Sequence, residues 1–149
     1  MGFTLNLMQL VHFFNADKRV TLNNRNSLKV FLTGLLHKEG KRELEYLSYI
    51  FCSDNYLLEI NRLFLQHDFY TDIVTFDLSS DKRTLNAEIY ISVDRVKENA
   101  QDIGVPFNIE LHRVIFHGVL HLCGFKDKTK LQKAMMRQME EQYIELYFK

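Results

Sequence analysis

Strand-like and helix-like segments follow one another along this chain without a regular rhythm, and that order is what most limits its fold. Phe3, Leu5 and Leu7 alternate with polar residues, which predicts an opening strand. β-branched and aromatic residues, which fit a pleated sheet, gather in further strand-like segments. These strands are expected at residues 43–53, 71–78 and 86–92. The polar turn at residues 79–83 favours antiparallel pairing of the last two.

Hydrophobic residues at the spacing of an α-helix define the remaining elements. The expected helices are residues 27–38, a segment that begins at Asp54, and residues 92–99, 108–123 and 129–147. Ser27, Asp54 and Ser92 stand where an N-cap side chain accepts a hydrogen bond from the first helical turn. Strands and helices without regular βαβ alternation are typical of the α+β class. We therefore expect a small mixed sheet of about four strands packed with about five helices, in a single domain of residues 1–149.

The charge balance and the cysteine count limit the partners and the compartment. The chain has 19 basic and 19 acidic residues, so any contact with RNA would come from a local basic patch. Cys52 and Cys123 are too few for a disulfide framework and fit a reducing compartment. No segment approaches the roughly 20 apolar residues of a membrane span, and the N-terminal residues lack the basic start of a signal peptide. We therefore expect a cytoplasmic protein with no membrane partner, and the oligomeric state stays open.

The segment from His117 to Asp127 carries the chemistry. His117 and His121 are four residues apart, so on a helix they share one face, with Cβ atoms about 5–6 Å apart. Gly124 is suited to the left-handed conformation that ends a helix and reverses the chain. Asp127, three residues later, could then bring its carboxylate back toward the two imidazoles. This spacing predicts three ligands for one metal ion.

Two histidines and one carboxylate are a ligand set of catalytic zinc, with a fourth position open for water. Manganese and iron accept the same ligands, but we expect one zinc ion (Zn2+) per chain. The alternative is that two histidines four residues apart on an apolar helix reflect core packing or coincidence, and the glycine and the aspartate argue against it. Cys123 points away from His121 on a helix, so we expect it in the core.

Gly118 sets this segment apart from the HExxH zinc proteases. In those enzymes a glutamate follows the first histidine and acts as general base, whereas glycine has no side chain. The protease machinery is therefore incomplete. Activation of a metal-bound water remains available, and a phosphodiester suits such a site because its anionic oxygen can bind the metal.

Residues 117–125, with the pattern His-Gly-x-Leu-His-Leu-x-Gly-aromatic, resemble the YbeY family of bacterial rRNA maturation factors and single-strand-specific metallo-endoribonucleases. Asn61, residues 71–76 and residues 87–92 also resemble family segments, so the likeness spans residues 54–127. The resemblance implies an α+β fold with a zincin-like metal helix and one zinc per chain. It also implies roles in maturing the 3′ end of 16S rRNA and in ribosome quality control. The implied partners are rRNA, or other single-stranded RNA, and the ribosome or its small subunit.

The chain departs from the family pattern at three positions. The usual third metal ligand of the family is histidine, and here the matching position is Asp127. Many members carry an arginine shortly after the matched asparagine, where this chain has Leu65. Glu88 replaces the usual aspartate of the third segment. The resemblance therefore implies Asp127 as an oxygen ligand and a substrate-phosphate contact that is missing or supplied elsewhere.

Arg113 and a group of lysines are candidates for that phosphate contact. Arg113 lies one helical turn before His117 and could pair with a phosphate through two hydrogen bonds, although a structural arginine is the commoner case. The lysines after Asp127 could form a phosphate track or simply a solvated helix start. The expected catalytic residues are His117, His121 and Arg113, the substrate-binding residues are Lys126, Lys128 and Lys130, and the metal ligands are His117, His121 and Asp127.

Two functions from different classes follow from these residues. The first is a zinc-dependent endoribonuclease whose metal-activated water attacks phosphorus, with the general base left open. The second is a ribosome-assembly binding factor whose metal is structural and which has little catalysis. Cleavage of single-stranded RNA by the metal-loaded protein separates the two.

Overall fold

The sheet has four strands and mixed directions. The computed structural model describes residues 9–149, so the strand expected from Phe3, Leu5 and Leu7 lies outside the described residues. The strands are β1 (Val11–Asn15), β2 (Glu43–Cys52), β3 (Ile73–Asp77) and β4 (Thr84–Ser92), in the order β1-β2-β4-β3. β2 pairs in parallel with β1 and β4, and β3 pairs antiparallel with β4. The predicted mixed sheet and the antiparallel pairing of its last two strands are confirmed.

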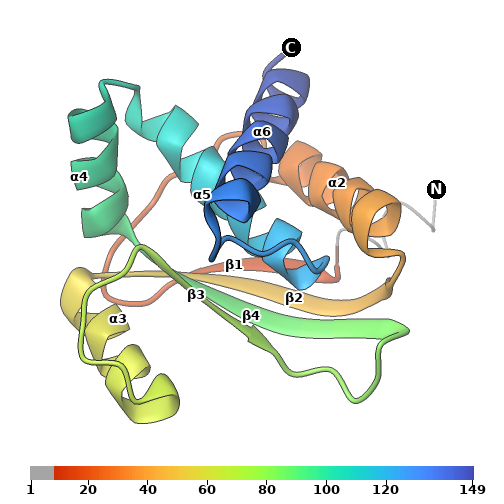
Figure 1. Ribbon diagram of the computed structural model, residues 1–149, viewed down its shortest axis with the longest axis horizontal. Helices are drawn as coiled ribbons and strands as arrows, with labels where there is room; N and C mark the ends of the chain where they lie inside the picture. The colour runs from red at the N-terminus through yellow and green to blue at the C-terminus, as the bar shows by residue number, and fades with distance from the viewer. Residues whose placement is uncertain (1–8) are drawn as a thin grey trace.

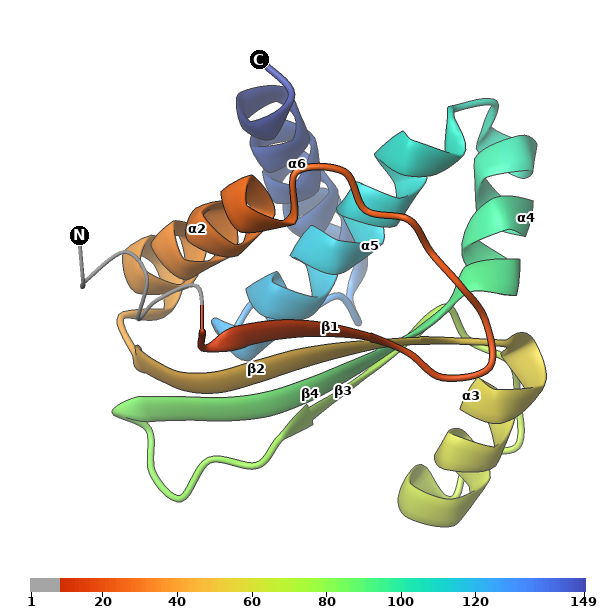
Figure 2. The ribbon, with the colours of Figure 1, turned by 180° about the vertical axis from the view of Figure 1, so that it is seen from behind.

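Five α-helices accompany the sheet in the described part of the chain. They are α2 (Arg25–Leu35), α3 (Asp54–Ile60), α4 (Val93–Ile103), α5 (Phe107–Leu122) and α6 (Lys130–Tyr147). Two π-helical turns, η1 (Leu36–Gly40) and η2 (Asn61–Leu65), extend α2 and α3. Figures 1 and 2 show α2, α4, α5 and α6 on one side of the sheet, whereas α3 lies on the other side, near the end of the strands at which α4 begins. The α+β class is confirmed, and none of these helices is long and apolar enough to cross a membrane.

Local signals place most helix starts to within two residues. Ser92 caps α4 as predicted, because its hydroxyl accepts a hydrogen bond from the Arg95 backbone N at 3.1 Å. The cap predicted at Asp54 is wrong by one residue: the Ser53 hydroxyl accepts the hydrogen bond, and Asp54 is the first helical residue. The cap predicted at Ser27 is also wrong, since α2 already begins at residue 25.

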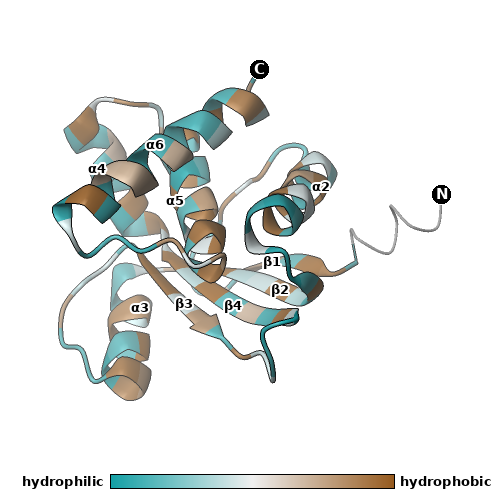
Figure 3. Ribbon diagram, turned by 45° about the vertical axis from the view of Figure 1, so that its right-hand side comes forward, coloured by the Kyte–Doolittle hydropathy of each residue, from teal (hydrophilic) through white to brown (hydrophobic). Residues whose placement is uncertain are grey.

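Helix α5 lies between the sheet and the outer helices, and most of its residues are buried. Phe116, Val119 and Leu120 of α5 join Leu47 and Ile89 of the strands in one hydrophobic core. Burial of such side chains stabilises the fold by about 1.5–3 kcal/mol each. Figure 3 shows hydrophobic residues in brown along the strands and through α5, and a second brown region at the free end of the helix labelled α3.

At Gly118, helix α5 lies close against the sheet. A Cβ atom at this position would lie 2.9 Å from Cδ1 of Ile89 on β4 and 3.0 Å from Cδ1 of Ile73 on β3. Those distances are shorter than ordinary contacts between carbon atoms. The absence of a side chain therefore lets the helix pack directly on the two strands.

A larger side chain at this contact should destabilise the protein. We expect Gly118→Leu to lower the free energy of unfolding by about 1–3 kcal/mol, because overpacking forces side chains or backbone to shift. Gly34 is a matched control: it is an exposed helical glycine, and a Cβ atom added there would meet no other atom within 4 Å. Gly34→Leu should leave stability unchanged or slightly raised, since leucine favours helix more than glycine does. Equal urea midpoints for the two variants would contradict the close packing.

Candidate metal centre

The chain reverses directly after α5 and brings Asp127 back to the helix. Gly124 has φ 101°, the left-handed conformation expected of it. Its N–H donates to the carbonyl oxygen of His121 at 2.9 Å, and the N–H of Phe125 donates to that of Leu120 at 3.1 Å. Such paired bonds satisfy the last carbonyls of a helix. The glycine thus ends α5 and turns the following residues toward the histidines.

His117, His121 and Asp127 meet at one point. Nε2 of each histidine lies 3.4 Å from Oδ2 of Asp127, and the three candidate ligand atoms all lie within 4.8 Å of one another. Ligand atoms held tetrahedrally about 2.1 Å from zinc are about 3.4 Å apart. The two imidazole planes are 84° apart, so the rings converge from different directions. The geometry and the donor types therefore fit a metal ion, and this group could hold one.

A buried glutamate from α6 holds the other side of His117. Oε2 of Glu140 lies 2.5 Å from Nδ1 of His117, and the residue is 5% exposed. Because a carboxylate accepts the Nδ1 proton, the hydrogen-bond network assigns the free lone pair of the ring to Nε2, which faces Asp127. Burial alone would lower the pKa of His117, but the hydrogen bond and charge of Glu140 and the charges of Asp72 and Asp127 raise it above its usual value.

Arg113 lies one turn before His117 but faces away from the cleft. Its guanidinium is buried and pairs with Glu141 at 2.7 Å, with Glu110 at 3.2 Å and with Glu140 at 3.7 Å. Three carboxylates therefore surround the cation, which is absent from the cleft lining. This placement does not offer the expected contact with a substrate phosphate. Arg113 instead supports Glu140, which in turn holds His117.

The candidate metal group lies in an open cleft of about 460 Å³. The lining residues come from η2, β3, the segment between them, α5 and the turn after it: Asn61, Leu65, His67, Phe69, Thr71, Asp72, Ile73, Val74, Thr75, His117, His121, Asp127 and Lys128. Asp72 is a carboxylate in this cleft that sequence reasoning did not single out. Burial raises its pKa, although the neighbouring His117 opposes that effect. The available signal was its place within residues 71–76, one of the segments that resemble the family.

The three predicted substrate-binding lysines are placed differently around the cleft. Lys128 lines the cleft. Lys126 and Lys130, each two residues from Lys128 in the sequence, are exposed and do not line it. Within residues 9–149, none of the three takes part in an ion pair. Lysines without a carboxylate partner are suited to contact an anionic ligand.

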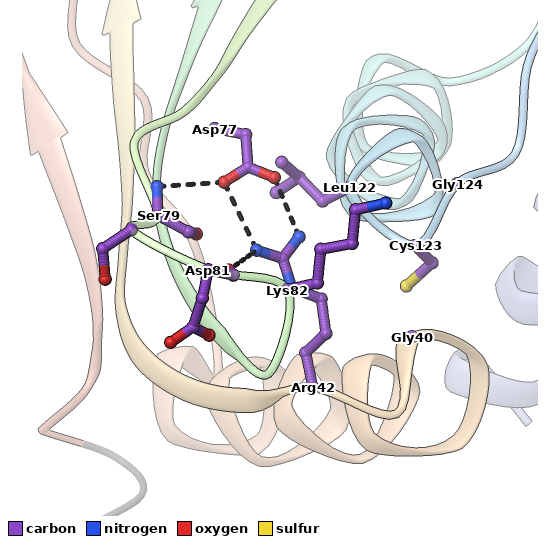
Figure 4. A pocket seen from close by; sticks show the side chains of 10 residues that line it. Gly40, Arg42, Asp77, Ser79, Asp81, Lys82, Leu122, Cys123 and Gly124 are labelled. Carbon is purple, nitrogen blue, oxygen red and sulfur yellow. Dashed lines mark hydrogen bonds and ion pairs between the residues drawn. The ribbon is translucent and has the colours of Figure 1, made fainter.

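A second hollow of about 650 Å³ is lined by the end of α5, by Gly40 and Arg42, and by the connection between β3 and β4 (Figure 4). The guanidinium of Arg42 binds the Asp77 carboxylate at 2.8 Å and the carbonyl oxygens of Thr84 and Asp81 at 2.7 and 3.3 Å. Arg42 directly precedes β2, so these bonds link the start of β2 to the connection between β3 and β4. Cys123 borders this hollow, and burial raises the pKa of its thiol to about 12.

The fold and the cleft define a small α+β domain whose buried helix presents a His-His-Asp group to solvent. A family model described as Endoribonuclease YbeY matches residues 12–147. A protein of Cytophaga hutchinsonii named Endoribonuclease YbeY is 48% identical over 138 residues, which cover 93% of this chain and 96% of that protein. One of Porphyromonas gingivalis with the same name is 52% identical over 137 residues, which cover 92% of this chain and 89% of that protein.

Among solved structures, the solution structure of TM1509 from Thermotoga maritima matches with a TM-score of 0.57 and 26% identity. The match covers 93% of this chain and 89% of that one, so both share the same overall fold. The chain belongs to the endoribonuclease YbeY family.

The carboxylate of Glu140 should matter for metal affinity. We expect Glu140→Gln to weaken zinc binding about 10- to 100-fold, because an amide supports the basicity of His117 less than a carboxylate does. Glutamine keeps the size of the side chain, so the fold should be retained. The measurement is competition against a chromophoric zinc chelator, together with thermal unfolding.

The control for this variant is Glu141→Gln. Glu141 also pairs with Arg113, but its side chain is 55% exposed and forms no ion pair or hydrogen bond with His117, which bonds to Glu140 instead. Zinc affinity should therefore be unchanged. Equal losses of affinity in both variants would contradict a specific role for Glu140.

Proposed function

We propose that this protein is a zinc-dependent endoribonuclease that hydrolyses phosphodiester bonds in single-stranded RNA. The observation that carries the proposal is the convergence of His117, His121 and Asp127 in an open cleft. Membership of the YbeY family supports RNA as the substrate class, since the matched relatives are named endoribonucleases. RNA, rather than peptide, also agrees with Gly118 in the position of the protease base.

Different residues in and behind the cleft would bind the metal, orient a ligand and accept a proton. When bound, zinc would lower the pKa of a coordinated water to about 7 and polarise a phosphoryl oxygen. His117, His121 and Asp127 would hold the ion, and Glu140 fixes the orientation of His117. The Asp72 carboxylate lies in the same cleft beside His117 and is a candidate to accept a proton.

The finer parts of the proposal rest on the family resemblance. It assigns the enzyme to ribosomal RNA, to maturation of the 3′ end of 16S rRNA and to ribosome quality control. The proposed location in the cytoplasm rests instead on the two cysteines and the lack of a predicted targeting or membrane segment. The chain has no net charge, so electrostatic attraction to RNA would be local. The exposed Lys128 supplies positive charge in the cleft, and Lys126 and Lys130 are exposed two residues away from it in the sequence.

The alternative, a binding factor with a structural metal, has less support. Structural zinc sites are usually closed by four protein ligands, whereas catalytic sites keep one position open. This group has three candidate protein ligands in the described residues, and the side chains of His121 and Asp127 are 27% and 38% exposed. An ion held there would be accessible to water and substrate.

RNA cleavage by the zinc-loaded protein is the direct test. We expect cutting of single-stranded RNA, slower cutting of duplex RNA, and loss of cutting in His121→Ala, because that variant lacks a metal ligand. His37→Ala is the control, since His37 is exposed and outside the cleft. Cutting that survives in His121→Ala would refute the enzyme, and no cutting by any zinc-loaded form would favour the binding factor.

Asp127 gives a test of the ligand set that does not depend on activity. We expect Asp127→Ala to bind zinc more weakly, and Asp127→His to bind it at one ion per chain, since both carboxylate and imidazole are zinc ligands. Elemental analysis after dialysis measures the zinc content. Full occupancy in Asp127→Ala would show that the third ligand lies elsewhere.

A further inference from the structure

The cleft has an aromatic wall beside the candidate metal group. Leu65, His67 and Phe69 line the same cleft as His117 and Asp127. Phe69 is 56% exposed, and Leu65 is 37% exposed. Large hydrophobic side chains scattered on a surface are ordinary, but a group of them at a reactive cleft marks a binding surface.

His67 and Phe69 form the flat part of this wall. Their ring centroids are 5.0 Å apart, and the ring planes differ by only 21°, so the rings are stacked. We call these two residues the stacking platform. The adjacent Tyr70 differs, because its ring lies under the guanidinium of Arg95 at 5.3 Å and its hydroxyl bonds to Asn55. Tyr70 is half-exposed, but these contacts hold it within the domain and it does not line the cleft.

The backbone under the platform is anchored. Asn61 is 1% exposed, and its side-chain N–H donates to the carbonyl oxygen of Phe69 at 3.2 Å. The N–H of His67 donates to the carbonyl oxygen of Asn61 at 3.1 Å. Asp68, which lies between His67 and Phe69 in the sequence, pairs with Arg62 at 2.6 Å. A ligand would therefore meet rings that are already positioned, which reduces the entropy lost on binding.

Lys128 completes the chemistry of the cleft. It is exposed, lines the cleft with the platform, and forms no ion pair within residues 9–149. A flat aromatic surface, a cation and a candidate metal group in one cleft match the parts of one nucleotide. The base has a flat π-face, and the backbone phosphates are anionic.

We propose that the stacking platform binds an unpaired nucleobase next to the scissile phosphate. A neighbouring phosphate then lies within reach of Lys128. This inference rests on the proposed function and identifies the part of the substrate that the cleft recognises. A base inside a duplex is covered by its neighbours on both faces, so it cannot lie on the platform. The platform thereby contributes to selection of single-stranded RNA.

Fluorescence of 2-aminopurine tests the proposal, because this base is quenched when it stacks. The probe is single-stranded RNA with one 2-aminopurine, mixed rapidly with the zinc-loaded full-length protein and read before cleavage proceeds. We expect quenching by the wild type, and in Phe69→Ala a loss of quenching with about 5- to 150-fold weaker binding. Phe69→Trp should restore both, since tryptophan also stacks.

The matched control is Leu63→Ala. Leu63 lies on η2 near the platform and is 71% exposed, but it does not line the cleft. RNA binding and quenching should be unchanged, and zinc content and thermal unfolding should be unaltered in all of these variants.

The outcomes separate this inference from the proposed function. Unchanged affinity and quenching in Phe69→Ala would overturn the platform, even if His121→Ala shows that the protein is a nuclease. This is also the result expected if the exposed rings contact a protein. Quenching that depends on Phe69 in a protein that cuts no RNA would support the platform and reject the nuclease.

Discussion

The packing of α5 against β3 and β4 is the contact on which the rest of the site depends. Gly118 allows it, because Ile73 and Ile89 occupy the space that a side chain would need. The close approach sets the candidate metal ligands beside the residues of β3 that line the cleft. Gly118 stands where an HExxH protease has its general base, and at this position the chain is packed against the sheet. Gly118 therefore supplies no proton acceptor, and in the proposed function Asp72, just before β3, is the candidate for that role.

Buried charged residues lie behind the candidate metal ligands, where α5 packs against α6. A carboxylate buried without a partner costs several kcal/mol, so Glu140 needs compensation to stay charged beside His117. Arg113 supplies part of it and is itself balanced by Glu110 and Glu141. The arginine that sequence spacing suggested as a substrate contact thus contributes indirectly, by keeping a carboxylate available to the histidine. Its distance along the helix was right for the site, but its direction could not be read from spacing alone.

The sequence reveals those features that arise from neighbours along the chain. Three predictions depend on residues that are near one another in the sequence. They are strand β4, the cap at Ser92, and the convergence of His117, His121 and Asp127. Glu140 and His117 lie 23 residues apart in different helices, so no local sequence pattern predicts the contact between them. Strand β1 was missed for a related reason. It has only five residues, and it is defined by parallel pairing with β2 across the intervening helix.

A neutral chain that acts on RNA must obtain affinity from more than charge. Phosphate contacts weaken with salt and report little about the bases. Leu65 stands where the family resemblance places an arginine in many members. In this chain it lines the cleft together with His67 and Phe69. The position at which the resemblance implies a phosphate contact thus lies on the same segment as the stacking platform. If the proposed function holds, the stacking platform of His67 and Phe69 adds selectivity for single strands, because only a base that is not covered by neighbours can lie on it.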